Sequence, residues 1–179
     1  MRKVTYGAGV SLDGYITGPD EAIDWLLWSD DAQAISSESW KGVDTMLMGR
    51  KTYEFAARSG GGVSKIKTYI FSRTMAEAPA GAELVREDAA GFVAALKATP
   101  GGDIIVMGGG ELGSALIEGG MVDEIGLNVH PLLLGGGIPF FRPIARRVPL
   151  TLVEARPIAR ECVLLRYRCS GGAEPVRAV

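Results

Sequence analysis

The sequence predicts an α/β protein with a mostly parallel central sheet, flanking helices and an antiparallel pair of strands near its C-terminus. Strand-like apolar runs alternate with short helical segments as far as Pro131, and only strand-like runs follow. The run Ile104–Met107 has large apolar residues without alternation, which indicates a strand covered on both faces. With 179 residues, of which 47% are hydrophobic, the chain can bury one sizeable core. We therefore expect a single domain over residues 1–169 and a tail over residues 170–179.

Each expected strand is an apolar run that ends at glycine, proline or polar turn residues. In chain order the strands are Val4–Leu12, Val43–Met48, Thr68–Phe71, Glu83–Arg86, Ile104–Met107, a strand ending near Pro131, Leu150–Ala155 and Cys162–Cys169. The small residues Gly7, Ala8 and Gly9 indicate that another group packs closely against the first strand. The last two strands are expected to form a hairpin around Arg156–Arg160.

Four short helices are expected between these strands. The first begins at Ser29 or Asp30, because either side chain can accept a hydrogen bond from the first turn, and it ends near Lys41. The others follow Gly49 to about Ala57, run from Glu87 or Asp88 to Lys97, and begin near Glu111. Segments with clustered turn residues are expected loops, namely Asp13–Glu21, Ser59–Ser64 and Leu132–Pro143.

The glycine triplet Gly108–Gly110 stands between the buried strand Ile104–Met107 and the helix that begins near Glu111. Glycines allow backbone N–H groups to approach a ligand where a side chain would obstruct it. The first turn of a helix adds free N–H groups and the positive end of its dipole, which together suit a phosphate. A tight turn without a ligand is the alternative, but the context favours an anion site.

Two further polar sequences follow the ends of predicted parallel strands. Gly49–Thr52 places two cations and a hydroxyl at a helix N-terminus, where the dipole disfavours positive charge unless an anion is bound. Ser72 and Arg73 follow the next strand and could reach the same phosphate. Ligands of open α/β sheets bind at the carboxyl edge of the strands, so we expect these three sites to share one edge.

Composition and motif counts exclude several other functions. The net charge of −2 argues against nucleic acid as a partner, and no apolar run is long enough to cross a bilayer. His130 is the only histidine, so no multi-histidine metal site is expected. Cys162 and Cys169 are seven residues apart in one predicted strand and cannot pair there. With no signal-peptide pattern near Met1, we expect a reduced, cytoplasmic setting.

Two kinds of residue are candidates for the substrate pocket. Asp13 lies at a glycine turn where an apolar strand ends, and it either caps that turn or lines the pocket. Trp25 and Trp28 are expected in the core or in the pocket wall.

Five motifs together resemble the dihydrofolate-reductase-like superfamily. They are Ser11–Ile16 (SLDGYI), Met48–Glu54 (MGRKTYE), Phe71–Arg73 (FSR), Met107–Gly110 (MGGG) and Leu134–Pro139 (LGGGIP). Their order and spacing over residues 1–169 are most similar to the branch that contains the reductase domain of the riboflavin-biosynthesis deaminase–reductase and its stand-alone relatives.

This resemblance implies a reductase that uses NADPH, with the nicotinamide supplying the hydride. Diphosphate, 2′-phosphate and nicotinamide contacts would come from Gly9, Val10, Ile16, Gly49, Arg50, Lys51, Thr52, Ser72, Arg73, Gly108, Gly109, Gly110, Glu111 and Leu112. Folate reductases have a cis Gly-Gly bond at the matching turn, so the resemblance also predicts a cis Gly108–Gly109 bond. Relatives are often dimers joined through their late strands, which implies a homodimer.

The substrate implied by the resemblance is a small molecule with a reducible C=O or C=N bond, bound near Asp13, Trp25 and the helix after Ser29. Counted from Gly49 without gaps, the catalytic carboxylate of folate reductases falls on Gln33, which cannot serve as an acid. Asp30 or Asp31 takes this place only if the register shifts, so Asp13, Trp25, Asp30 and Gln33 are the candidate catalytic and substrate residues. Riboflavin-pathway reductases usually have lysine where this chain has Tyr15. The absence of the catalytic acid supports a first alternative, a nucleotide-binding module without turnover, and a dihydrofolate reductase is the second alternative.

Overall fold

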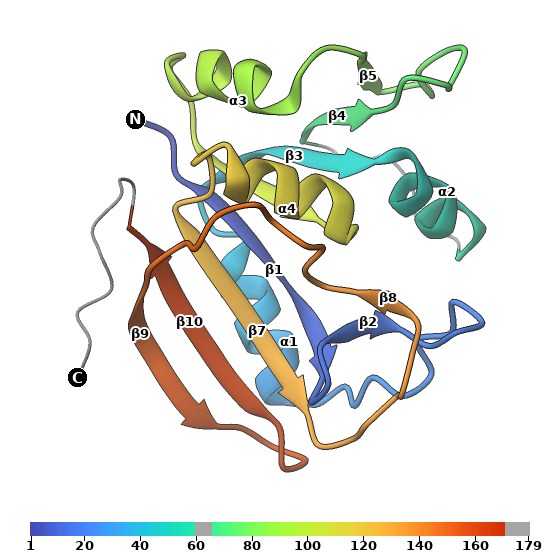
Figure 1. Ribbon diagram of the computed structural model, residues 1–179, viewed down its shortest axis with the longest axis vertical. Coiled ribbons are helices and arrows are strands. Elements are labelled where there is room, and N and C mark those ends of the chain that lie inside the picture. The colour runs from blue at the N-terminus through green and yellow to red at the C-terminus, as the bar shows by residue number, and fades with distance from the viewer. Residues whose placement is uncertain (60–65, 171–179) are drawn as a thin grey trace.

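The centre of the protein is an eight-stranded sheet with the order β5-β4-β3-β6-β1-β7-β10-β9 (Figure 1). The computed structural model describes residues 1–59 and 66–170, so the predicted tail from residue 171 and most of the predicted loop Ser59–Ser64 lie outside the described residues. The strands are β1 (Val4–Ser11), β3 (Val43–Gly49), β4 (Lys67–Phe71), β5 (Ala82–Val85), β6 (Asp103–Met107), β7 (Glu124–His130), β9 (Leu150–Pro157) and β10 (Val163–Cys169). All pairs from β5 to β7 are parallel, whereas β10 is antiparallel to β7 and β9. The predicted fold class is confirmed.

The helices agree with the predicted ones to within a few residues. They are α1 (Asp30–Ser39), α2 (Arg50–Arg58), α3 (Ala89–Lys97) and α4 (Gly110–Glu118). The Ser29 hydroxyl accepts a hydrogen bond from the Ala32 N–H at 3.2 Å, so the predicted cap of α1 is present. In the described part of the chain, no helix has the length and apolar character needed to cross a membrane.

A small second sheet, β2 (Tyr15–Thr17) with β8 (Ile138–Pro139), occupies two places where the sequence predicts loops. The Phe140 N–H donates to the Gly14 carbonyl at 2.9 Å and extends this pairing. A Cβ on Gly137 would lie 2.0 Å from the Thr17 carbonyl oxygen, so only glycine permits the approach. Gly137, which the sequence places in a loop, is thus needed for this close contact.

One face of the large sheet is covered by α3 and α4 and carries the main hydrophobic core (Figure 1). The ring of Tyr6 stacks on Phe140 with centroids 4.2 Å apart, and its hydroxyl donates to the Phe140 carbonyl at 2.7 Å. Tyr6 and Leu116 are both 0% exposed. A Cβ on Gly113 would lie 2.2 Å from the Tyr6 ring, so α4 can approach β1 this closely only because that residue is glycine.

The opposite face carries two small hydrophobic clusters that lie apart. The first contains Met46, Met48 and Ile70, and the second contains Ile158, Cys162 and Leu164. Helix α1 lies behind the sheet in Figure 1 and contributes one buried residue, Ala32. The part of the sheet between the clusters, formed by β1 and β7, is therefore less closely covered by the described helices than the opposite face is.

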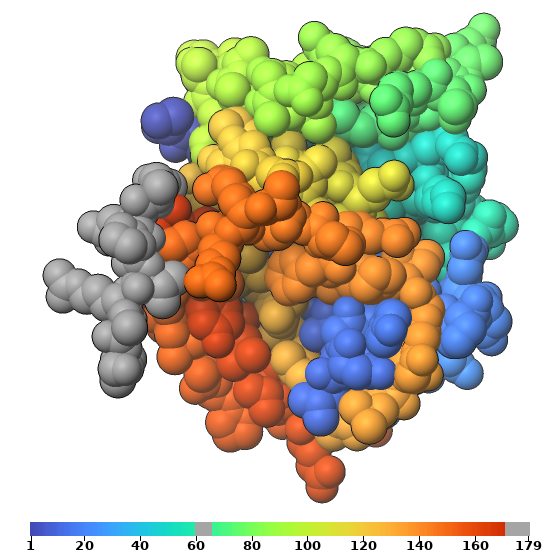
Figure 2. Space-filling view, in the orientation of Figure 1, coloured from blue at the N-terminus to red at the C-terminus, as the bar shows by residue number. Residues whose placement is uncertain are grey.

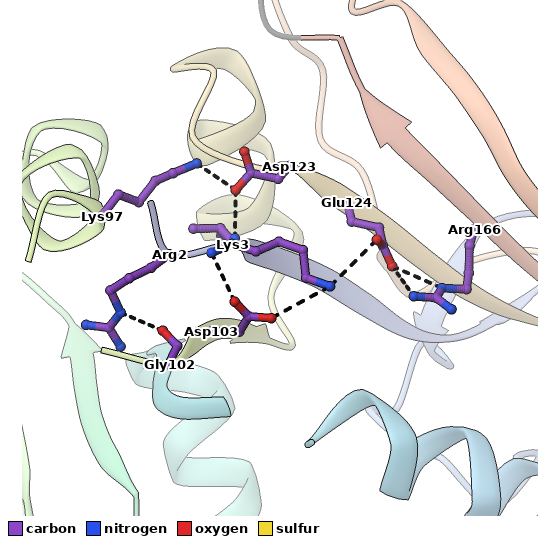
Figure 3. A network of polar contacts seen from close by, with 9 residues as sticks. Arg2, Lys3, Lys97, Gly102, Asp103, Asp123, Glu124 and Arg166 are labelled. Atoms are coloured by element: carbon purple, nitrogen blue, oxygen red, sulfur yellow. Dashed lines mark hydrogen bonds and ion pairs between the residues drawn. The ribbon is translucent and has the colours of Figure 1, made fainter. Parts of the chain in front are cut away.

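Ion pairs join the strands at their amino ends, opposite the predicted phosphate edge (Figure 3). The Lys3 ammonium lies 3.7 Å from Asp103 and 3.8 Å from Glu124. Glu124 accepts two hydrogen bonds from Arg166, at 3.0 and 2.5 Å. These contacts tie β1, β6, β7 and the antiparallel strand β10 together on the side away from the carboxyl ends of the parallel strands.

Candidate functional site

A cleft of about 850 Å³ lies between α1 and the uncovered part of the sheet. Its floor contains Gly7 and Gly9 of β1 and Gly126 of β7, and its wall includes the segment Leu26–Trp28 and the inner side of α1. A Cβ on Gly126 would meet nothing within 4 Å, so this part of the floor is open. The size suits a small organic ligand, and the flat glycine floor suits a planar one.

The glycine bend after β6 adjoins both the cleft and the start of α2. Gly108 lines the cleft, and a Cβ on it would lie 2.5 Å from Thr52 Cγ2 and 2.6 Å from Thr52 Oγ1. The predicted Gly108–Gly109 cis bond is wrong, because that bond is trans. The turn is made instead by two successive positive φ angles, 70° at Gly108 and 36° at Gly109, which glycine adopts readily. The structure thus brings together two of the predicted phosphate segments.

The two helices that begin at this edge have first turns without a side-chain cap. Gly109 precedes α4 and Gly49 precedes α2, and in neither helix does a first-turn N–H donate a capping hydrogen bond to a described side chain. Helices α1 and α3, by contrast, are capped by Ser29 and Asp88. Uncapped N–H groups at a helix start are available to an anion.

Positive charge lies at the same edge. Arg50 and Lys51 form the first turn of α2, where no acidic residue stands. The Arg50 guanidinium donates to Glu54 at 2.7 Å, while Lys51 is exposed. Because Gly49 pairs with Phe71, Ser72 and Arg73 follow β4 directly beside the start of α2. Arg73 is exposed, and Ser72 Oγ accepts hydrogen bonds from the Thr74 and Met75 N–H groups.

The remaining predicted cofactor residues occupy different settings. Gly9 lines the cleft, whereas Val10 is buried and Ile16 packs against the main core. In the first turn of α4, Glu111 is exposed and Leu112 is buried. Their roles toward a cofactor stay predictions.

Asp13 lies outside the residues that line the cleft. Its carboxylate accepts hydrogen bonds from Ser11 Oγ at 2.6 Å, the Leu134 N–H at 3.1 Å and the Gly135 N–H at 2.8 Å. The Ser11 hydrogen bond, aided by these N–H groups, lowers the pKa of Asp13 below its usual value. Asp13 thus holds two loops together through these hydrogen bonds. Its lowered pKa favours the ionised carboxylate, which is poorly suited to donate a proton.

The other predicted substrate residues lie near the cleft but not in its lining. Trp25 donates its indole N–H to the Ala22 carbonyl at 3.2 Å and packs edge-on against the ring of His130. Asp30 and Gln33 are exposed on α1. Asp31 does line the cleft, and its carboxylate accepts the Ala159 N–H at 3.0 Å.

His130, for which the sequence favours a structural role, lies in the cleft wall and is 2% exposed. Its Nδ1 accepts the Leu27 N–H at 3.3 Å and lies 3.5 Å from Cys162 Sγ. Burial lowers the pKa of His130, so the ring is neutral at pH 7. With Nδ1 accepting, the proton of the neutral ring resides on Nε2.

Asn128 is a cleft residue that the sequence reasoning missed. Its Oδ1 is buried and accepts no hydrogen bond from any described residue. The pattern of β7 could have revealed it, because Ile125, Leu127 and Val129 alternate with Glu124, Gly126, Asn128 and His130. Such alternation indicates one apolar face and one polar or small face. Within the described ranges, no three histidine, cysteine or acidic residues are grouped to hold a metal ion.

Comparison with known sequences identifies the family. A sequence model described as the RibD C-terminal domain matches residues 2–164. This chain belongs to the RibD C-terminal domain family. The uncharacterised protein YyaP of Bacillus subtilis (strain 168) is 30% identical over 184 residues, which cover 96% of this chain and 97% of YyaP.

Solved structures agree with the fold. A putative riboflavin biosynthesis protein from Shewanella sp. PV-4 superposes with a TM-score of 0.84 at 22% identity, covering 94% of this chain and 99% of that one. A dihydrofolate reductase from Enterococcus faecalis, in complex with NADP(H) and RAB-propyl, gives a TM-score of 0.69 at 16% identity, with 93% and 96% covered. The chain therefore has the fold shared by riboflavin-pathway and folate reductases.

Proposed function

We propose that this chain is a reductase that uses NADPH to reduce a small heterocyclic substrate, in the manner of a 5-amino-6-(5-phosphoribosylamino)uracil reductase. The observation that carries the proposal is the carboxyl edge of β6, β3 and β4, where two uncapped helix starts, a glycine bend and exposed cations lie side by side. These are the groups that a dinucleotide diphosphate and a 2′-phosphate require. Membership of the RibD C-terminal domain family supports the same function.

The residues divide into two sets under this proposal. The N–H groups of Gly108–Leu112 and the first turn of α2 bind the diphosphate, and Ser72 with Arg73 binds the 2′-phosphate. When bound, the nicotinamide supplies the hydride. The cleft between α1 and the glycine floor holds the substrate and excludes water. We further propose that the protein acts in the cytoplasm, which is consistent with its two free cysteines.

The test compares the binding of NADPH and NADH to the parent protein and to two variants. NADPH is expected to raise the melting temperature more than NADH does. The variant Arg73→Ala is expected to weaken NADPH binding about tenfold, because one charge-assisted contact is lost, and to leave NADH binding unchanged. Arg58→Ala is the matched control, since Arg58 is an exposed arginine in the last turn of α2, paired with Glu21. Equal shifts with NADPH and NADH in the parent protein would remove the 2′-phosphate assignment.

Turnover separates a reductase from a nucleotide-binding module with the same fold. Steady NADPH oxidation with pterins or pyrimidinones supports the reductase, whereas tight NADPH binding without turnover on any of them supports the module. Folate reduction is the third candidate, because Asp31 is one of two acids, with Glu38, that α1 contributes to the cleft lining. That candidate requires oxidation dependent on dihydrofolate that falls when Asp31 becomes asparagine.

We also propose that the protein is a homodimer joined through β9 and β10. Leu150, Leu152 and Val153 of β9 are 43%, 54% and 46% exposed. β9 is the edge strand of the sheet, and no described helix lies over it where its atoms are visible in Figure 2. An apolar edge of this kind is usually paired. Sedimentation should show a dimer that Leu152→Glu dissociates, and a monomeric parent protein would end this proposal.

A further inference from the structure

Asn128 is the only asparagine of the chain, and its side chain lies on the cleft face of β7. Across the sheet it pairs with Gly9 of β1 and Leu164 of β10. In the described part of the chain, Asn128 Oδ1 is the sole buried side-chain polar atom without a partner. Burial of an unpaired amide oxygen destabilises the folded state, so a protein that retains one in a cleft needs a reason.

His130 supplies a complementary group two residues further along the same face of β7. Because its Nδ1 accepts the Leu27 N–H, its Nε2–H is free to donate. That nitrogen faces the floor, since a Cβ on Gly9 would lie 3.3 Å from His130 Nε2. One acceptor without a partner and one donor with a fixed tautomer thus lie beside the glycines of the floor.

The Leu26 side chain lies on the floor beside Asn128. A Cβ on Gly9 would lie 2.7 Å from Leu26 Cδ2, so Leu26 rests directly on that glycine. Leu26 belongs to a segment without helix or strand, between β2 and α1. A flat ring that lies on Gly9 would therefore have to displace the Leu26 side chain.

We propose that Asn128 is the specificity-determining residue of the cleft and that it binds a cis-amide edge, with Oδ1 accepting an N–H and Nδ2 donating to the adjacent C=O. This inference rests on the proposed function and deepens it: the substrate is a planar ring in which an N–H and a carbonyl are neighbours. A carboxamide matches such an edge with two parallel hydrogen bonds. His130 donates to a further acceptor of the same ring.

Two sources could present this edge: the substrate ring or the carboxamide of the nicotinamide. The position of Asn128 favours the substrate. β7 is separated by β1 from β6, which ends in the glycine bend assigned to the diphosphate. Asn128 also lies two residues, or about 6.6 Å, below the end of β7 at His130, and therefore deeper in the cleft.

The test uses a matched pair of ligands, lumazine and 1,3-dimethyllumazine, which differ in the N–H groups of the amide edge. Calorimetry with the parent protein should show lumazine binding at least tenfold more tightly. Asn128→Leu should reduce this ratio to about one, and its melting temperature should stay the same or rise, because the orphan oxygen is gone. Asn128→Asp keeps an acceptor for the N–H but loses the donor to the C=O, so it should bind lumazine more weakly and still prefer it to 1,3-dimethyllumazine.

The opposite results overturn the inference. These are a parent protein that binds both ligands equally or not at all, a ratio unchanged in Asn128→Leu, a lost preference in Asn128→Asp, or a melting temperature lowered by more than a few degrees in Asn128→Leu. A change in NADPH affinity instead of lumazine affinity, absent with the 3-acetylpyridine analogue of NADPH, would assign Asn128 to the cofactor. If lumazine discrimination holds but NADPH does not bind, the reductase proposal fails and this site remains.

Discussion

Both faces of the central sheet depend on glycine residues, but these residues have opposite effects on the two faces. On the face covered by α4, Gly113 lets the helix approach until a Cβ would lie 2.2 Å from the Tyr6 ring. On the face of α1, Gly126 leaves open space, and the helix buries only Ala32. Glycine therefore permits close helix packing on one face and leaves space for a ligand on the other.

This difference teaches that stability and ligand binding are largely separate in this fold. The α4 face supplies the continuous core, with Leu116 and Tyr6 fully buried. The α1 face supplies a cleft between two small clusters. Substitutions on the first face should alter the free energy of unfolding, and substitutions on the second should alter affinity for a ligand.

The largest effect is expected for Leu116→Ala on the packed face. Leu116 is 0% exposed, so its truncation leaves a cavity and should lower the free energy of unfolding by about 2–5 kcal/mol. The matched change on the other face is Ile35→Ala in α1, which borders the cleft and should cost about 1 kcal/mol. Urea denaturation measures both, and equal losses would contradict the contrast between the faces.

Two glycines on the cleft floor sharpen the comparison further. A Cβ on Gly7 would lie 2.6 Å from the Gly126 carbonyl oxygen, so Gly7→Ala should destabilise the protein by about 1–3 kcal/mol. Gly126→Ala meets no atom and should change stability by less than about 1 kcal/mol. The added methyl projects into the cleft, so it should weaken lumazine binding. Unaltered binding would show that the ring does not lie on this floor.

The parallel strands and the glycine segments that follow them could be predicted from the sequence because their causes are local, whereas the order of the strands in the sheet was not predicted. Buried parallel strands appear as unbroken apolar runs, as at Ile104–Met107, and their carboxyl ends must share an edge once the strands are parallel. Gly49–Thr52 and Gly108–Gly110 were found in this way, and they do lie in contact.

The cleft itself could not be predicted, because it depends on contacts between distant segments. The role of Asp13 is set by N–H groups of Leu134 and Gly135, more than a hundred residues away. Similarly, β2 and β8 are strands only because each pairs with the other. Gln33 was placed by counting without gaps, whereas the rotation of α1 turns Asp31 rather than Gln33 toward the cleft.

A smaller effect is expected from pH, through His130 on the cleft face. Burial lowers the pKa of His130 in the folded protein, so the unfolded chain takes up the proton first as the pH falls. The pKa of the histidine in the unfolded chain is about 6.5. Below this pH the free energy of unfolding should fall, by at most about 1.4 kcal/mol per pH unit. Urea midpoints at pH 7.5 and 5.5 should differ in the parent protein, and His130→Phe should reduce that difference. The same slope in His130→Phe would assign it to other groups.

The smallest effect is expected at Asp13, which belongs to neither the packed face nor the cleft lining. Asp13→Asn replaces one carboxylate oxygen by an NH₂ group, which cannot accept the hydrogen bonds that Leu134 or Gly135 now donates. The melting temperature should therefore fall slightly at pH 7. In the parent protein this contribution should vanish in acid, as the pH falls through the lowered pKa of Asp13. Asp20→Asn is the control, because Asp20 accepts one backbone N–H, from Ala22. Since the Asp13 carboxylate is engaged in hydrogen bonds that hold two loops together, we expect kcat for NADPH oxidation to be retained in Asp13→Asn. A large loss of kcat at an unchanged melting temperature would instead make Asp13 the catalytic acid and extend the active site beyond the cleft.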